Sequence, residues 1–383
     1  MNRQKFDKTC LIRPRSLLFL GIISIASAPV ASFAKNYDAY RSDYAKGAFC
    51  SAIAGACASD FNPENSFFQN PASLESSTPD LVYDGDYNPS DNLEPGMKVG
   101  NEVSDSTFMG GVAHAGPEWG LGFAFSGRLS QVKASSTLFD DNDVARDIKT
   151  TTSGTTLTFN IPAAIKLTPN LVVGAALLGL YYKENINIEE APSSNSSAID
   201  KLPKLGLSIG ALFTLNQYFR VGSWFRTPIT YSVHQHIDYQ KFGSPLIFDE
   251  DINLKYPFMS ATGISIMPWG DTRTLFVDID VVGTTLYGFE RTLDTFEGAA
   301  NDRALRAKGR KAVIEPHIAW RSPWWTESLG TFTVGYYFET SRWRGLPGRN
   351  HLVASVSYKL SLGEPIIALD VAPDYFGMQI SFR

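Results

Sequence analysis

The chain has 383 residues, with 34 lysine and arginine residues against 39 aspartate and glutamate residues, so its formal net charge is −5. This negative balance disfavours nucleic acid as a partner, because phosphate backbones attract basic proteins. Aromatic residues make up 13% of the chain and charged residues only 19%. Such a composition fits either a secreted β-sandwich or a membrane-spanning β-barrel, whose apolar character is hidden in the alternation of its strands.

Residues 1–34 are predicted to be a secretory signal peptide. A leader with five basic residues precedes an apolar stretch at 17–28, and Ala31-Ser32-Phe33-Ala34 has the small-x-small spacing that signal peptidase recognises. The apolar stretch is too short to span a bilayer as a helix. Cleavage after Ala34 would leave 29 basic and 38 acidic residues, a net charge of −9.

Residues 35–78 are rich in small and polar residues and lack strand alternation. They include Cys50 and Cys57, the two cysteines that remain after cleavage. An oxidising compartment favours a disulfide between them, whereas one straight helix would hold them too far apart to bond. The sequence leaves this question open, and it offers no nearby histidine for a metal site.

From residue 80 onward, apolar and polar residues alternate in segments separated by turn residues, which predicts β-hairpins. The predicted strands are 80–87, 106–114, 119–129, 155–167, 171–184, 205–215, 218–233, 253–267, 272–286, 312–321, 330–341, 351–361, 365–371 and 374–382. The count is fourteen, and twelve is the alternative if the first and the thirteenth are not strands.

Short turns alternate with long polar gaps at 130–154, 187–203, 235–251 and 290–311. Short turns at one end and long loops at the other are typical of outer-membrane barrels. The last predicted strand ends the chain with apolar residues on one face, as the closing strand of such a barrel does. We therefore expect the protein in the outer membrane of a Gram-negative bacterium.

The alternation also assigns the inward face of each strand. One inward face carries Arg220, Trp224 and Arg226, and another carries Asp278 and Asp280. Charged groups need partners in a dry interior. The barrel must therefore hold ion pairs, water or a polar plug.

Three stretches resemble the FadL-like family of outer-membrane transporters for long-chain fatty acids and other hydrophobic compounds. Residues 67–74 (Phe-Phe-Gln-Asn-Pro-Ala-Ser-Leu) resemble the family signature aromatic-x-Asn-Pro-Ala-Gly-Leu. Residues 221–228 (Val-Gly-Ser-Trp-Phe-Arg-Thr-Pro) resemble its Gly-x-x-Tyr-Arg-Ser-Pro strand, and residues 275–280 (Leu-Phe-Val-Asp-Ile-Asp) are similar to its Leu-Tyr-Ala-Asp-Val-Asp strand.

This resemblance implies an all-β fold, a transmembrane antiparallel β-barrel of about 14 strands at 79–383 with an N-terminal hatch at 35–78 that plugs the lumen. The hatch motif would comprise Phe67, Phe68, Asn70, Pro71 and Ala72. The resemblance also implies that a hydrophobic ligand is captured outside and released sideways through a gap near a kinked third strand.

The third predicted strand carries Gly120, Gly122 and Gly127, which would form this lateral gate, because glycine weakens a strand and often marks a bend. The alternative is that these small residues only fit a crowded wall.

Arg226 is the first candidate for binding a fatty-acid carboxylate, because a guanidinium pairs with a carboxylate through two hydrogen bonds. Its alternative role is an internal ion pair with one of the two inward aspartates named above. Arg128, Arg220 and Trp224 are further candidates for ligand binding.

The sequence has no nucleophile-elbow motif and no metal-ligand cluster, so we expect neither an enzyme nor a cofactor. The predicted function is a passive outer-membrane channel for hydrophobic small molecules such as long-chain fatty acids or hydrocarbons. The alternatives are a structural or adhesive barrel whose extracellular loops bind a partner, and a general porin. The expected partners are the hydrophobic ligand, outer-membrane lipid and lipopolysaccharide, and the barrel-assembly machinery.

Overall fold

The computed structural model describes the chain in segments that cover most of its length. These segments are residues 47–60, 63–76, 80–92, 101–139, 145–188, 195–199, 204–239, 246–269, 273–283, 290–291, 310–323, 330–341, 347–358, 365–372 and 375–382. The chain divides into two compact units, 1–32 and 33–383, and all described residues belong to the second. The predicted signal peptide at 1–34 therefore lies outside the described residues.

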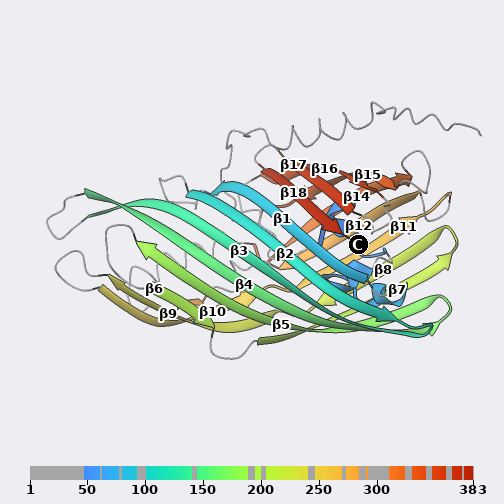
Figure 1. Ribbon diagram of the computed structural model, residues 1–383, viewed down its shortest axis with the longest axis horizontal. Coiled ribbons are helices and arrows are strands. Elements are labelled where there is room, and N and C mark those ends of the chain that lie inside the picture. Colours follow the sequence, from blue (N-terminus) through green and yellow to red (C-terminus); the bar gives the residue numbers. More distant parts are fainter. Residues whose placement is uncertain are drawn as a thin grey trace, which may run out of the picture. The chain divides into compact units, whose positions relative to one another are not determined.

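The described residues form three short helical turns followed by strands (Figure 1). The helices are α2 (Gly47–Ala52), α3 (Pro63–Phe68) and the 3-10 helix η2 (Pro71–Ser76). The strands are β1 (Asp80–Asn92), β2 (Asn101–Ala115), β3 (Trp119–Phe139), β4 (Ala145–Thr168), β5 (Leu171–Ile188), β6 (Asn195–Ile199), β7 (Lys204–Asn216), β8 (Phe219–Arg226), β9 (Ile229–Tyr239), β10 (Leu246–Tyr256), β11 (Met259–Ile266), β12 (Thr274–Gly283), β13 (Glu290–Arg291), β14 (Ala312–Pro323), β15 (Thr331–Glu339), β16 (Arg349–Ser357), β17 (Pro365–Ala372) and β18 (Tyr375–Phe382). No helix in these segments is both long and apolar enough to cross a membrane.

The strand pairings form a closed antiparallel ring. In the described segments the order around the ring is β1, β2, β3, β4, β5, β7, β8, β11, β12, β14, β15, β16, β17 and β18. β18 then pairs with β1 from Tyr83↔Phe382 to Tyr87↔Met378, which returns the ladder to its start. The fold is an antiparallel β-barrel with the strand count of fourteen that the sequence predicts.

The remaining strands lengthen members of the ring. β9 follows β8 and β10 precedes β11, and β9 pairs with β10 in the register that β8 and β11 continue. The gaps at 130–154 and 235–251, expected to be long loops, are largely strand, because β3, β4, β9 and β10 extend into them. In the gap at 187–203 the described residues are the end of β5 and the short strand β6. The expectation was wrong for 130–154 and 235–251, whereas most of each of the gaps at 187–203 and 290–311 lies outside the described residues.

The barrel wall buries polar residues and exposes apolar ones, the reverse of a water-soluble core. Leu352 is 66% exposed and Ile314 is 60% exposed, while Asp278 and His351 are each 1% exposed. Along β14 the buried and exposed positions alternate, as the period of a strand requires. An apolar outer band around a polar interior is the pattern of a transmembrane β-barrel.

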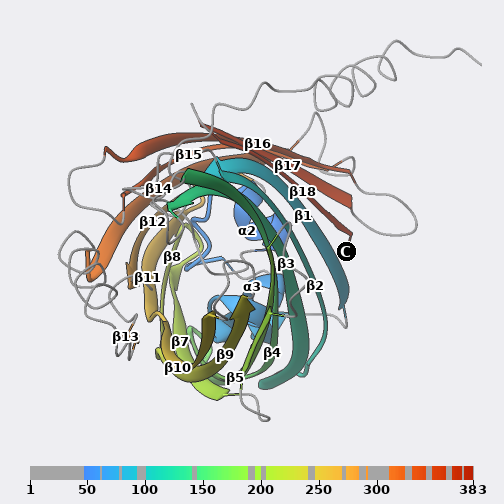
Figure 2. The same cartoon turned by 90° about the vertical axis from the view of Figure 1, so that its left-hand side faces the viewer.

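The segment 47–76, here called the inner segment, is enclosed by the ring (Figure 2). α2 contacts β1 and β15 to β18, α3 contacts β2, β3 and β4, and η2 contacts β2 to β5 and β7. Because these strands come from opposite sides of the ring, the inner segment spans its interior. Its described parts are 47–60 and 63–76, so the remainder of the region expected at 35–78 lies outside the described residues.

The ladder between β3 and β4 is interrupted at one level of the wall. The pairing runs through Leu121↔Ala163 and resumes at Ala124↔Asn160, and neither Gly122 nor Phe123 is paired with β4. Pro162 stands opposite Gly122 in this register, and proline has no amide hydrogen to give to the ladder. The wall therefore has fewer cross-strand bonds at this point of β3 than on either side of it.

Candidate functional site

The inner segment turns back on itself at the end of α2. Ala54 and Gly55 both have positive φ, 55° and 81° respectively, and Cys50 and Cys57 are joined by a disulfide. The amide of Gly55 donates to the carbonyl of Cys50 at 2.8 Å. The helix therefore ends before Cys57, which removes the obstacle that one straight helix would have posed to the bond.

Glycines of the barrel wall make room for the inner segment. A Cβ atom added to Gly222 would overlap the carbonyl of Ala58, and one added to Gly210 would overlap the side chain of Asn70. The same holds around the ring for other inward glycines, whose added Cβ atoms would meet the inner segment: Gly111 at Phe67, Gly120 at Leu74, Gly174 at Pro71 and Ala72, and Gly335 at Ala54. The inner surface of the wall therefore leaves room for both the backbone and the side chains of the inner segment.

Two barrel side chains bind the carboxyl end of α3. The amide of Asn160 on β4 donates to the carbonyl of Phe67, and the guanidinium of Arg226 on β8 donates to the carbonyl of Phe68. The last carbonyls of a helix have no partner within the helix itself. Asn160 and Arg226 supply those partners from the wall, and each is only 2% exposed.

Asn70 links the inner segment internally and to the wall. Its amide nitrogen donates to the carbonyl of Ala58 at 2.8 Å and to that of Ala211 on β7 at 3.2 Å. Its side-chain oxygen accepts from the amide of Ala72 at 3.1 Å, which caps the start of η2. Every polar atom of this fully buried side chain is therefore in use, which is a physical reason for asparagine in the Asn-Pro-Ala stretch.

Acidic, basic and imidazole side chains of β12 and β14 hold the part of the inner segment around the disulfide. The amide of Ala58 donates to Asp278 at 2.6 Å, and a ring nitrogen of His317 donates to the carbonyl of Ala54 at 2.6 Å. Asp60 lies 3.6 Å from the guanidinium of Arg321. The sequence argument left ion pairs, water or a polar plug as partners for the inward charges, and in the structure backbone groups and Asp60 of the inner segment are among those partners.

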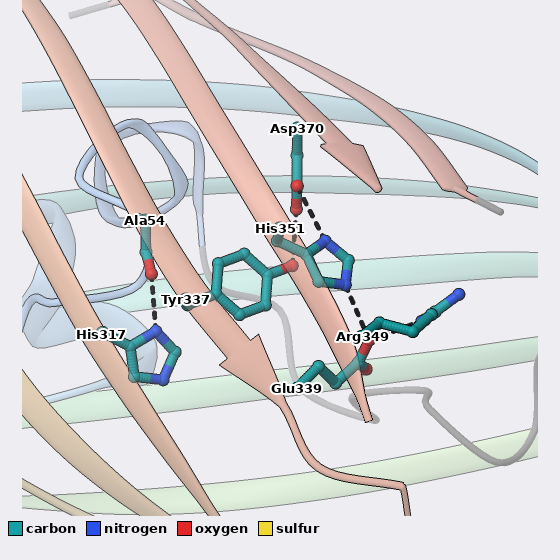
Figure 3. Close-up of polar contacts among 7 residues, drawn as sticks. All are labelled: Ala54, His317, Tyr337, Glu339, Arg349, His351 and Asp370. Carbon is teal, nitrogen blue, oxygen red and sulfur yellow. Dashed lines mark hydrogen bonds and ion pairs between the residues drawn. The ribbon is translucent and has the colours of Figure 1, made fainter. Parts of the chain in front are cut away.

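A polar network continues from His317 along the inner faces of β15, β16 and β17 (Figure 3). The rings of His317, Tyr337 and His351 stack in sequence, with centroids 5.3 Å and then 4.2 Å apart. The two nitrogens of His351 lie 2.9 Å from Asp370 and 2.9 Å from Glu339. Both carboxyl groups can accept a hydrogen bond from a ring N–H of His351.

Further hydrogen bonds extend this network. Arg349 binds Glu339 at 2.6 Å, and the hydroxyl of Tyr337 donates to Asp370 at 2.6 Å. Figure 3 places Arg349 and Glu339 at one end of the network and Ala54 of the inner segment at the other. The described residues contain no group of three or more His, Cys, Asp or Glu side chains placed to hold a metal ion.

The structure does not bring the predicted ligand-binding residues together. Trp224 and Arg226 are neighbours on the inner face of β8, with the guanidinium 5.4 Å from the Trp224 ring centroid. Arg220 lies six residues from Arg226 on the same strand, about 20 Å away along it. Arg128 is half-buried on β3, on another part of the wall. Ligand binding by Arg226, or by one of the alternative candidates, stays a prediction.

The two inward aspartates contact groups of the inner segment and of β14. Asp278 accepts from the amide of Ala58, and Asp280 lies 3.4 Å from a ring nitrogen of His317. Sequence reasoning placed both aspartates inside correctly. It missed that the partner of Asp278 is the backbone of the inner segment, for which strand alternation carries no signal.

The three glycines expected at the lateral gate divide between the two faces of β3. Gly120 and Gly122 face inward, where added Cβ atoms would meet Leu74 and, at 3.5 Å, the ring of Phe67. Gly127 has the outward alternation, and the ring of Phe108 covers it. Only Gly122 lies at the interruption of the β3–β4 ladder.

No protein-family model matches the sequence, and no curated protein matches it. Several solved structures match the fold. The toluene transporter TbuX of Ralstonia pickettii is 13% identical with a TM-score of 0.57, over 88% of this chain and 96% of that one. The toluene transporter TodX of Pseudomonas putida is 12% identical with a TM-score of 0.58, over 90% of this chain and 97% of that one. A FadL homologue of Pseudomonas aeruginosa is 11% identical with a TM-score of 0.57, over 90% and 98%. This chain therefore has the barrel fold of the FadL-like transporters, which confirms the fold that the sequence resemblance implied.

Proposed function

We propose that this protein is a passive channel of the Gram-negative outer membrane that takes up hydrophobic small molecules, long-chain fatty acids or hydrocarbons among them. The fold it shares with two toluene transporters and a FadL homologue supports this proposal. Transfer from water to apolar walls and then to lipid is driven by burial of nonpolar area. The route needs no energy source, and neither catalysis nor a cofactor has a part in it.

One observation carries the proposal: apolar side chains of the inner segment lie directly behind the interrupted part of the wall. Phe67 and Leu74 are fully buried against Gly122 and Gly120, and Phe123 is 48% exposed on the outer face. A hydrophobic ligand at this level would find apolar groups on both sides of the weakest part of the β3–β4 ladder. We assign the lateral gate to this point, with residues 35–78 as the hatch.

We assign Arg226 to holding the hatch, because it donates to the carbonyl of Phe68 from a buried position. Ligand-binding roles for Arg128, Arg220 and Trp224 stay predictions. Outer-membrane lipid, lipopolysaccharide and the barrel-assembly machinery stay the expected partners of a barrel in that membrane.

Uptake into cells that lack their own transporter tests the function. Labelled fatty acid, alkane and toluene are supplied separately to cells with and without this protein, and we expect uptake of at least one to depend on it. Equal uptake with and without the protein, for all three compounds, would leave the structural or adhesive barrel as the better account.

Crosslinking tests the gate. A short thiol crosslinker applied to the Phe123→Cys/Ile161→Cys protein ties β3 to β4 at the interruption, and we expect it to abolish uptake. The matched control is Thr227→Cys/Phe258→Cys, which faces another break in the wall, between the β8–β11 and β9–β10 pairings. Equal inhibition of both proteins would remove the assignment of the gate to β3 and β4.

A further inference from the structure

The loop closed by the disulfide has a backbone that needs external support. Ala54 takes a positive φ of 55°, a left-handed conformation that is unfavourable for a residue with a Cβ atom. Cys50 and Cys57 are 0% and 3% exposed, so the bond is inside the barrel. Unfavourable backbone conformations persist only where the surroundings determine them from several sides.

The barrel wall binds this part of the chain through two backbone groups, one within the disulfide loop and one directly after it. The carbonyl of Ala54 lies inside the disulfide loop and accepts from His317 on β14. The amide of Ala58 directly follows Cys57 and donates to Asp278 on β12. Both distances are 2.6 Å, and both wall side chains are buried.

Apolar packing joins the same loop to the same side of the barrel. The buried cluster contains Cys50, Cys57 and Ile53 from the loop, together with Phe276 of β12 and Val353 of β16. The loop therefore fits this wall only while the directions of its carbonyl and its amide are both fixed. A closed covalent loop fixes them, because it removes most of the alternative backbone conformations of residues 51–56.

We propose that Cys50 and Cys57 are positioning residues that keep the hatch seated: their disulfide holds Ala54 and Ala58 in register with His317 and Asp278, and a protein without it leaks small polar solutes. This inference rests on the proposed function, in which the inner segment closes the channel. Beyond that function, the inference assigns to the Cys50–Cys57 disulfide the role of keeping the channel closed.

The test measures swelling of liposomes that contain the purified protein when a small sugar is the external solute. Dithiothreitol reduces the disulfide to two thiols while its own two thiols become a disulfide, so the chain stays otherwise unchanged. The Cys50→Ala/Cys57→Ala protein is the second form, and the processed chain then has no cysteine, because Cys10 lies in the predicted signal peptide. We expect swelling about 10- to 100-fold faster in both forms than in the oxidised protein, since a freed loop of this length regains that much conformational freedom.

A double-mutant cycle tests the route through His317. His317→Phe keeps a ring beside Tyr337 but removes the donor to Ala54. If the disulfide acts by placing that carbonyl, reduction adds little to the leak of the His317→Phe protein, whereas independent effects would multiply. Circular dichroism identical to that of the oxidised protein confirms that each form is folded.

The outcomes separate this inference from the function on which it rests. Swelling that is unchanged by reduction and in the double cysteine variant overturns the inference, even if hydrophobic compounds are taken up. If reduction and His317→Phe each raise the leak rate by the same factor alone and in combination, the disulfide does not act through the carbonyl of Ala54. An oxidised protein that takes up no hydrophobic compound overturns the proposed function, whatever the effect of reduction on the leak.

Discussion

Replacing Arg226 by methionine separates its two candidate roles. Methionine keeps most of the volume and the apolar stem of the side chain but donates no hydrogen bond. The carbonyl of Phe68 then loses its wall donor inside the barrel, and an unsatisfied buried acceptor costs about 1–3 kcal/mol. If the hatch exchanges between a seated and a released form, this cost raises the released fraction about 5- to 150-fold.

The assay is the conductance of the purified Arg226→Met protein in planar bilayers, with uptake of labelled fatty acid measured in cells. We expect higher conductance to small ions and, because the hatch is looser, no selective loss of fatty-acid uptake. Asn160→Leu should behave alike, because Asn160 binds the neighbouring carbonyl of Phe67. Arg273→Met is the control, since Arg273 is exposed beside Trp269 just before β12. Unchanged conductance together with a selective loss of fatty-acid uptake would refute the reasoning and restore the ligand-binding role.

Three further substitutions test the seat, the motif asparagine and the polar network. Gly222→Ala puts a methyl group against the carbonyl of Ala58 and should destabilise the seated hatch by about 1–3 kcal/mol. Faster proteolysis of residues 47–76 would report this, whereas the control Ser223→Ala on the outer face should leave the proteolysis rate unchanged. Asn70→Leu removes three hydrogen bonds and should destabilise the seated hatch by about 2–4 kcal/mol; a proteolysis rate equal to that of the parent protein would contradict this. His351→Phe keeps the ring stack but removes one donor from each of Glu339 and Asp370, which keep Arg349 and Tyr337 as partners. Thermal unfolding in detergent should therefore report a loss of about 1–3 kcal/mol, and an unchanged midpoint would show that the network contributes little.

The sequence predicts the strands within the lipid layer well, because each has one apolar and one polar face there. Phe159 and Asn160 illustrate this, since their alternation assigns the outer and the inner face, and Asn160 is buried. Prediction fails where β4 and β5 extend beyond that layer. Residues 149–154 (Lys-Thr-Thr-Thr-Ser-Gly) are polar on both faces of the strand, so no period of two is visible and a loop is predicted.

The candidate site is less predictable, for a related reason. Alternation gives the face of Arg226 or Asp278 but not what lies opposite it across the interior. Their partners are backbone groups of Phe68 and Ala58, and any residue type offers a backbone carbonyl or amide. The sequence also leaves the disulfide between Cys50 and Cys57 undecided. The bond depends on the backbone turn at Ala54, and strand alternation carries no information about that turn.

The polar residues on the inner face of the wall and the short helices of the inner segment stabilise each other. α2 and α3 have six residues each, too few to be stable alone in water. Their backbone groups also need hydrogen-bond partners in an interior from which water is excluded. The wall supplies donors at Asn160, Arg226 and His317 and an acceptor at Asp278, and without the inner segment these polar groups would line an open bore. In a porin, water would hydrogen-bond such inward polar side chains. Here the backbone of the inner segment binds them instead. The side chains of Phe67 and Leu74 then form the apolar surface behind the interrupted part of the wall.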